Sequence, residues 1–143
     1  MSETTPGRLD AAQITALFAA SPFISTLKLE VLAIDYGTTE LSVRMPLHAG
    51  LERRAGTKQF HGGPIASLIE VVGDFAIGMM VGGGVPTINL RIDYLKPAVG
   101  DALTAIARVR RAGKTAAVVD IDVFDDQGAL VAMGRGTYFP QRG

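Results

Sequence analysis

A short turn and a nearby acid are the residues of this sequence whose types and spacing suit chemistry. The segment His61-Gly62-Gly63-Pro64 opens an apolar stretch that carries Glu70. Glycines at the start of a helix leave backbone N–H groups unshielded, and the positive end of the helix dipole adds to them. The turn therefore suits stabilisation of an oxyanion, and the carboxylate suits a general base or a nucleophile. The plainer alternative is a tight turn with Pro64 as a helix-starting residue.

The distance between these two features limits how they can cooperate. Gly62 and Glu70 are eight residues apart, which is roughly 12 Å along one helix axis. One carbonyl group cannot contact both from the same helix. Two such helices that run antiparallel across a two-fold axis would bring Gly62 of one subunit level with Glu70 of the other. A catalytic interpretation therefore requires a dimer with two shared sites.

The order of elements predicts an α+β domain in which an antiparallel sheet packs around one long helix. Asp10 to Ala20 has the apolar spacing of a short helix with Asp10 as its N-cap, and Pro64 to Gly84 is the long helix. Residues 1–143 are expected to form one domain, with residues 1–24 as a helical flap. Alternation and turn residues predict strands at Leu27–Ala33, Leu41–Met45, Ile88–Tyr94, Asp101–Arg111, Thr115–Phe124 and Ala129–Phe139.

Composition narrows the class of protein. Fourteen Lys and Arg balance fourteen Asp and Glu, so no global charge attracts nucleic acid or an anionic membrane. The absence of cysteine excludes thiolate nucleophiles, disulfides and Cys-based metal sites. Residues 1–12 lack a secretory pattern, and Glu70 and Asp74 interrupt the most apolar stretch. We expect a cytoplasmic protein with no nucleic-acid or membrane partner.

The predicted long helix has two different faces. One is apolar at helical spacing and suits the sheet: Ile65, Leu68, Ile69, Val72, Ala76 and Met79. The other mixes small residues with two acids: Gly63, Ala66, Ser67, Glu70, Gly73, Asp74 and Gly78. Small residues cost packing area and helix stability, so this face predicts a close neighbour or a ligand. The alternative is a loosely packed helix with an exposed acidic stripe.

Further motifs complete a resemblance to a known family. They are Thr87 at a strand start, the Asp93-Tyr94-Leu95-Lys96-Pro97 segment and the Arg111-Ala112-Gly113-Lys114-Thr115 turn. With the His-Gly-Gly turn and Glu70, they resemble the hotdog-fold acyl-CoA thioesterases of the phenylacetate-degradation type over about residues 25–139. The resemblance implies a sheet wrapped around the long helix, two subunits that share a continuous sheet, and dimers that pair into tetramers.

The resemblance also implies catalytic roles. Glu70 would attack the thioester carbonyl or activate water to do so, and the Gly62 N–H would polarise that carbonyl. His61 would shape the turn or contact the substrate, and Thr87 would orient the acid or its water. Taken alone, His61 is more often a structural histidine, and the alternative for Thr87 is an ordinary strand residue.

Gly63, Gln59 and Asp74 are the expected substrate-binding residues. The family usually has Asn or Gln six residues before the His, where this chain has Ala55, so Gln59 or Thr57 is the candidate replacement. Asp74 either raises the pKa of Glu70 by repulsion, binds the polar end of an acyl group, or is a surface acid.

Two segments are expected to bind the coenzyme A portion of the substrate. The cations Lys96, Arg111 and Lys114 suit its phosphates, and the resemblance places them on the nucleotide and pantetheine track. A solvated charged hairpin is the alternative. The coenzyme A residues implied are Lys96, Pro97, Arg111, Gly113, Lys114 and Thr115. No separate cofactor and no metal are implied.

The leading prediction is therefore hydrolysis of acyl-CoA thioesters to free acid and CoA. A non-hydrolytic acyl-CoA-binding protein is the alternative, since Ala55 marks a missing donor. A hydratase ranks third because neither His48 nor His61 stands in the arrangement associated with that activity. The acyl group depends on a tunnel built from two chains.

Overall fold

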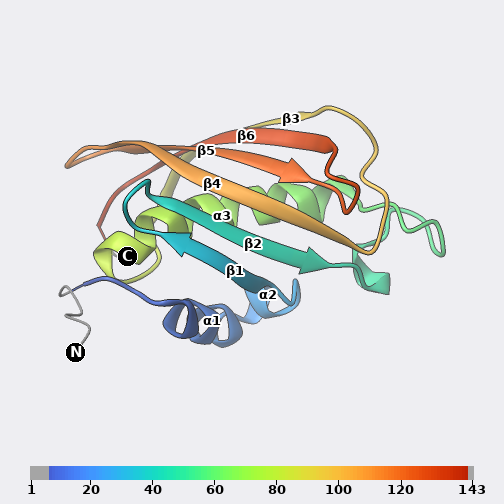
Figure 1. Ribbon diagram of the computed structural model, residues 1–143, viewed down its shortest axis with the longest axis horizontal. Coiled ribbons are helices and arrows are strands. Elements are labelled where there is room, and N and C mark those ends of the chain that lie inside the picture. The colour runs from blue at the N-terminus through green and yellow to red at the C-terminus, as the bar shows by residue number, and fades with distance from the viewer. Residues whose placement is uncertain (1–6, 142–143) are drawn as a thin grey trace.

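One antiparallel sheet wraps a long central helix (Figure 1). The computed structural model describes residues 7–141. The central helix is α3 (Gly62–Val81), and six strands pair in the order β1-β2-β4-β5-β6-β3. The strands are β1 (Glu30–Asp35), β2 (Glu40–Pro46), β3 (Thr87–Tyr94), β4 (Ala102–Ala112), β5 (Ala117–Phe124) and β6 (Leu130–Tyr138). This arrangement confirms the predicted α+β hotdog fold.

Helix α3 is the core of the molecule. All six residues of its predicted apolar face are buried. The helix is long and apolar enough to span a membrane, but 61% of the tested window is buried within the chain, so it serves as a core helix here. The helix begins two residues before the predicted Pro64, because the Nδ1 atom of His61 caps the Gly63 N–H at 2.9 Å. It ends at Gly82, whose φ of 93° is accessible to glycine without strain.

The small residues of α3 have neighbours within the same chain. A Cβ atom at Gly73 would lie 2.2 Å from the Tyr138 hydroxyl, and one at Gly78 would lie 2.6 Å from the Gly83 carbonyl oxygen. Both glycines are buried. The predicted close neighbour therefore exists for these two positions, and it is the C-terminal strand or the helix's own exit loop. Glu70 remains partly exposed.

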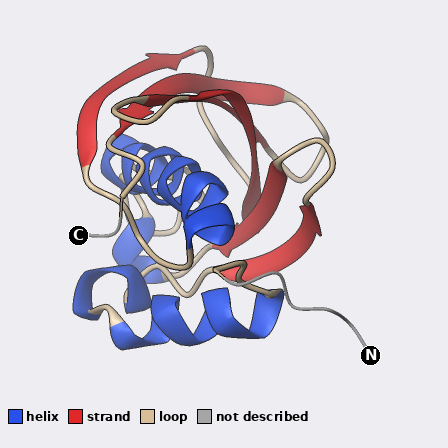
Figure 2. Ribbon diagram, turned by 90° about the vertical axis from the view of Figure 1, so that its left-hand side faces the viewer, coloured by secondary structure: helices blue, strands red, loops and turns tan. Residues whose placement is uncertain are grey.

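Two short helices cover the side of α3 that the sheet leaves open (Figure 2). They are α1 (Ala11–Ala20) and α2 (Pro22–Ser25), of which only α1 was predicted. The predicted N-cap is confirmed: Asp10 accepts from the Gln13 N–H at 2.8 Å, and Gln13 caps in return. Phe18 packs edge-on against Phe75 of α3, with ring centroids 4.9 Å apart. The expected flap is thus part of the packed body, although its residues 1–6 lie outside the described residues.

The first strand differs from the prediction. It starts at Glu30 rather than Leu27, because α2 and a turn at Lys28, with φ of 53°, occupy the preceding residues. A register shift between Val31 and Ala33 then reverses the alternation, so Ala33 is exposed and Ile34 is half-buried. The segment before α3 was expected to be a loop and contains the single 3-10 turn η1 (Ala49–Leu51) among the described residues.

Candidate active site

The turn that starts α3 is fixed from two sides. His61 caps the helix through Nδ1, and the Tyr94 hydroxyl donates to the Gly62 carbonyl oxygen at 2.9 Å. A Cβ atom at Gly62 would lie 3.5 Å from the Tyr94 ring, which is ordinary contact. The His61 ring therefore shapes this turn, which fits the first role that the resemblance implied as well as a purely structural role. Tyr94 was missed as a partner of this turn.

Glu70 is held at both its side chain and its main chain. The Thr87 hydroxyl donates to Glu70 Oε1 at 2.7 Å, across the space between α3 and β3. From the core side, the Tyr138 hydroxyl donates to the Glu70 carbonyl oxygen at 3.0 Å. Glu70 Oε2 has no hydrogen-bond partner among residues 7–141. One carboxylate oxygen is thus oriented, and the other is available.

Asp74 is half-buried and anchors a loop. Its Oδ1 atom accepts from the Val85 N–H at 2.7 Å and so ties the loop after α3 to the helix. Burial, with a contribution from the charge of Glu70, raises the pKa of Asp74 to about 7, against the lowering effect of the Val85 bond. The carboxylate binds this loop, and no ion pair of the described residues includes it, so the salt-bridged form of the surface-acid alternative is not observed.

A hollow of about 330 Å³ lies beside the glycine turn. It brings together four predicted site residues, Gln59, Gly62, Lys96 and Pro97, with Tyr94, which the sequence placed in a motif but gave no role in the site. Its lining is Arg53, Gln59, Phe60, Gly62, Ile65, Tyr94, Leu95, Lys96, Pro97 and Ala98. Apolar walls with a few polar groups are typical of a binding site for an organic ligand.

The loop before α3 decides between the two candidate replacements for the missing amide. The Thr57 hydroxyl donates to the Arg54 carbonyl oxygen at 2.7 Å, within its own turn. Ala55 is exposed on the same turn and does not line the hollow. Gln59 does line it, and its side-chain amide has no partner among the residues that the structure describes. Gln59 is therefore the better candidate.

The two segments expected to bind coenzyme A lie at opposite ends of the sheet (Figure 1). Lys96 follows the end of β3, where the Lys96 N–H donates to Val131. The turn that contains Arg111 and Lys114 joins β4 to β5 next to the other end of β6, where Ala117 pairs with Tyr138. Strand β3, which has eight residues from Thr87 to Tyr94, separates these ends by roughly 23 Å. One chain does not bring the two segments together.

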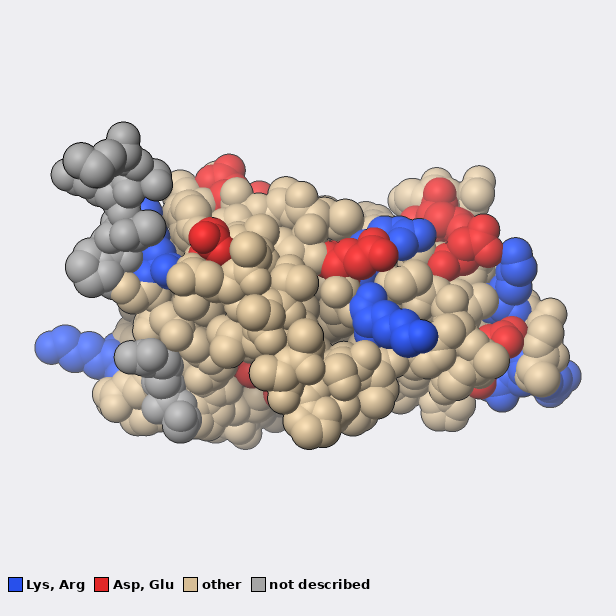
Figure 3. Space-filling model, turned by 90° about the horizontal axis from the view of Figure 1, so that it is seen from below, with Lys and Arg blue, Asp and Glu red and all other residues tan. Residues whose placement is uncertain are grey.

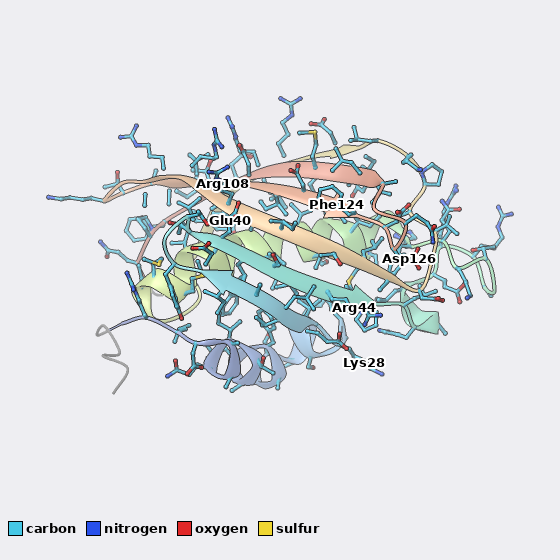
Figure 4. The ribbon with its side chains drawn as sticks, in the orientation of Figure 1. Lys28, Glu40, Arg44, Arg108, Phe124 and Asp126 are labelled. Atoms are coloured by element: carbon cyan, nitrogen blue, oxygen red, sulfur yellow. The ribbon has the colours of Figure 1, made fainter. Side chains whose placement is uncertain are left out.

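Charged side chains also line the outer face of the sheet, which sequence reasoning did not single out. Figure 4 labels Glu40 on β2 and Arg108 on the neighbouring strand β4. The Arg108 Nε atom lies 3.8 Å from the Glu40 Oε1 atom. Arg135 binds Asp120 through two nitrogens at 2.6 and 2.9 Å and so lowers the pKa of this acid. A second hollow, of about 560 Å³, lies on this outer face, and four arginines and four acids line it. The positive and negative charges around it are therefore equal in number.

The view from below (Figure 3) shows a different face, mostly free of charged side chains. Charges of both signs gather toward one end of this view, the end where α3 begins in Figure 1. Lys58 of the loop before α3 binds Asp101 there at 2.8 Å, which lowers the pKa of the acid and raises that of the lysine.

A sheet wrapped around a long central helix defines the hotdog class of proteins, and this chain adds a glycine turn at the helix start and an oriented acid along the helix. The pattern of the thioesterase superfamily matches residues 59–132. A Halobacterium salinarum protein that carries a provisional esterase name is 36% identical over 115 residues, which cover 73% of this chain and 76% of that protein. The chain belongs to the thioesterase superfamily.

Named relatives support the same class. Acyl-coenzyme A thioesterase PaaI of Escherichia coli is 28% identical over 122 residues, covering 85% of this chain and 84% of that protein. The E. coli PaaI structure matches with a TM-score of 0.72, covering 90% of this chain and 92% of that one. Zebrafish thioesterase superfamily member 2 matches with a TM-score of 0.77 at 26% identity, covering 92% and 98%. The predicted family is confirmed.

Proposed function

We propose that the protein hydrolyses acyl-CoA thioesters to the free acid and CoA, at two sites shared by the subunits of a homodimer. The observation that carries this proposal is the 2.7 Å hydrogen bond from Thr87 to Glu70 Oε1. It orients the carboxylate and leaves Oε2 to accept a proton from water or to attack the substrate. A solvated surface carboxylate is not held in one orientation, whereas this hydrogen bond fixes that of Glu70.

The proposed reaction needs a base, a nucleophile and an oxyanion donor. Glu70 removes a proton from water while the water oxygen forms a bond to the thioester carbon. The carbonyl oxygen becomes an oxyanion, which the Gly62 N–H and the start of α3 stabilise. Collapse of this intermediate breaks the C–S bond, and the CoA thiolate takes up the proton. Direct attack by Glu70, followed by hydrolysis of the resulting anhydride, is the other route compatible with this acid.

The shared site follows from distances within one chain. The Gly62 turn and Glu70 lie about 12 Å apart along α3, and the two coenzyme A segments lie at opposite ends of the sheet. An antiparallel pair of subunits would join Glu70, Thr87 and the β4–β5 turn of one chain with the hollow of the other. Gln59, Gly62, Gly63, Lys96 and Pro97 of the partner subunit would then hold the thioester and the pantetheine arm.

The exposed edge of β3 suits such a pair. Strand β3 ends the sheet on one side, and Ile88 on it is 58% exposed. An unpaired edge strand with exposed apolar residues is a template for pairing with another chain. Pairing of such dimers into a tetramer remains a prediction from the family resemblance.

Cations at the ends of the expected track suit the phosphates of coenzyme A. Lys96, Arg111 and Lys114 are exposed, and no ion pair formed by the described residues includes them. They are therefore free to bind anionic oxygens without first breaking a salt bridge.

The test offers purified protein a panel of short, medium and aromatic acyl-CoAs and measures thiol release over time. Glu70→Gln keeps the size of the side chain but removes the base, and we expect kcat to fall at least about a hundredfold with binding retained. Glu30→Gln is the matched control, because Glu30 lies on the opposite edge strand, paired with Arg44 at 3.0 Å.

The alternative is a binding protein without hydrolysis, and Ala55 favours it. Saturable binding of acyl-CoA, with no thiol release that depends on Glu70, would select this alternative. Turnover that Glu70→Gln leaves unchanged would exclude the assigned role of Glu70 in either route.

A further inference from the structure

Tyr138 is a buried phenol placed directly beneath the acid of the proposed site. It is the last residue of β6 and is 0% exposed. Its hydroxyl donates to the main-chain carbonyl of Glu70 at 3.0 Å, although 68 residues separate the two in sequence. Burial and the nearby acids Glu70 and Asp74 raise its pKa, so the hydroxyl keeps its proton and remains a donor.

Two glycines make the space that this ring occupies. A Cβ atom at Gly73, one turn after Glu70 on α3, would lie 2.2 Å from the Tyr138 hydroxyl oxygen. A Cβ atom at Gly136, on the same strand as Tyr138, would lie 2.4 Å from its ring. Glycine in a helix interior costs about 1 kcal/mol relative to alanine. Glycine at position 73 therefore destabilises the helix slightly but leaves room for the Tyr138 hydroxyl.

The residue opposite Tyr138 on the neighbouring strand holds the other end of Glu70. Thr87 is the register partner of Tyr138 in the β3–β6 pair, and its hydroxyl binds the Glu70 carboxylate. The Phe139 N–H donates to the Pro86 carbonyl oxygen at 2.9 Å and extends this pairing by one bond. A single pair of opposed strand residues thus contacts both the backbone and the carboxylate of Glu70.

We propose that Tyr138 is a positioning residue for the reaction: it sets the place of Glu70 on α3 relative to Thr87 and so keeps the carboxylate aimed at the substrate. This inference rests on the proposed thioesterase function. The phenol does not touch the substrate and transfers no proton. It acts because a hydrogen bond to a helix carbonyl and a close-packed ring limit how far α3 slides along β6 and β3.

The test variant is Tyr138→Phe, which keeps the ring and removes only the hydroxyl. Misplacement of a catalytic group by about 1 Å costs up to about a hundredfold in rate, and we expect kcat to fall about tenfold with KM unchanged. Tyr36→Phe is the matched control: its hydroxyl also donates to a main-chain carbonyl, that of Leu9, at the far α1 end. Both variants are expected to lose similar thermal stability, while only Tyr138→Phe loses turnover.

A double variant separates positioning from general weakening of the fold. If Tyr138 acts through Glu70 and Thr87, the combined Tyr138→Phe and Thr87→Val variant loses less than the product of the two single losses, because both act on one carboxylate. Full multiplication of the losses, or equal loss of kcat in Tyr36→Phe, would overturn the positioning role.

A crystal structure of Tyr138→Phe gives a readout that does not depend on turnover. We expect the Thr87 to Glu70 contact, 2.7 Å in the wild type, to lengthen or break. If wild-type protein releases thiol from no acyl-CoA, the proposed function fails, and this distance still decides the role of Tyr138. An unchanged contact would overturn it.

Discussion

Gln59 is the candidate replacement for the amide that is missing at Ala55, and both residues belong to the loop before α3. The amide that the family usually places at residue 55 is absent, while the amide of Gln59 lines the hollow beside Gly62. Thr57 competes for the same task on sequence grounds alone. The Thr57 hydroxyl already donates to the Arg54 carbonyl oxygen. Thr57 is therefore the weaker candidate for the missing donor.

Replacing Gln59 by alanine is expected to lower kcat about a hundredfold, the usual effect of losing one oxyanion donor. Gln127→Ala is the matched control, since Gln127 is exposed on the β5–β6 turn. Steady-state thiol release measures both. A larger loss in Thr57→Ala than in Gln59→Ala would give the role to Thr57 instead.

Asp74 predicts how stability changes with pH. Its pKa in the folded protein is about 7, against 3.8 for the free group. Between these values the folded state binds more protons than the unfolded state, so stability falls as pH rises and the loss is complete above about pH 7. Asp74→Asn keeps an oxygen for the Val85 N–H and removes the charge.

The variant should therefore be more stable than the wild type at pH 8. Its advantage is expected to grow by on the order of 3 kcal/mol between pH 5 and pH 8. Urea unfolding at both values measures this difference. A constant advantage across this range would show that Asp74 is not protonated in the folded state.

Helix α1 is an element whose stability and position have separate causes. Its capping box stabilises the start of the helix, while Phe18 against Phe75 and the Leu9 N–H on the Met79 carbonyl fix it to α3. The packing contacts lie toward the C-terminal half of α3, beyond Glu70. The element therefore supports the core without lining the hollow.

Loss of the cap is expected to affect folding only. Asp10→Ala should lower the free energy of unfolding by about 1 kcal/mol, with kcat and KM unchanged. Asp10→Asn is the control, since asparagine caps as well as aspartate. Denaturant unfolding and thiol release together check the prediction, and a loss of turnover in Asp10→Ala would mean that α1 takes part in the site.

At the scale of the whole molecule, the sheet has two edge strands, and only one of them suits the proposed dimer. Strand β1 ends one side and β3 ends the other, and each exposes an aliphatic residue, Leu32 at 51% and Ile88 at 58%. Only the β3 edge contains Thr87, the hydrogen-bond partner of the proposed catalytic acid. The proposed dimer therefore uses β3 and leaves β1 free.

Ile88→Lys places a charge on the proposed shared edge and is expected to yield monomers without thiol release. Leu32→Lys places the same charge on the other edge and should remain dimeric and active. Sedimentation and the thiol assay measure both properties. A fully active monomeric Ile88→Lys would show that one chain completes the site by itself.

The amino-acid pattern by itself determined the features that depend on neighbours in sequence. The apolar face of α3 and the Asp10 cap follow from spacing along one element. The order of helices and strands along the chain follows from alternation and turn residues. The His-Gly-Gly turn and Glu70 were recognisable for the same reason. Local patterns carry this information because helices and strands repeat at fixed periods.

Tertiary structure alone decided which distant residues meet. Tyr138 reaches Glu70 across 68 residues. Only the folded loop shows that the Thr57 hydroxyl donates to the Arg54 carbonyl while Gln59 lines the hollow. The bulge after Val31 and the turn at Lys28 likewise moved the first strand out of its predicted phase. These outcomes depend on close packing between elements. The periodicity of the sequence does not indicate, for example, that Gly73 leaves room for the Tyr138 ring.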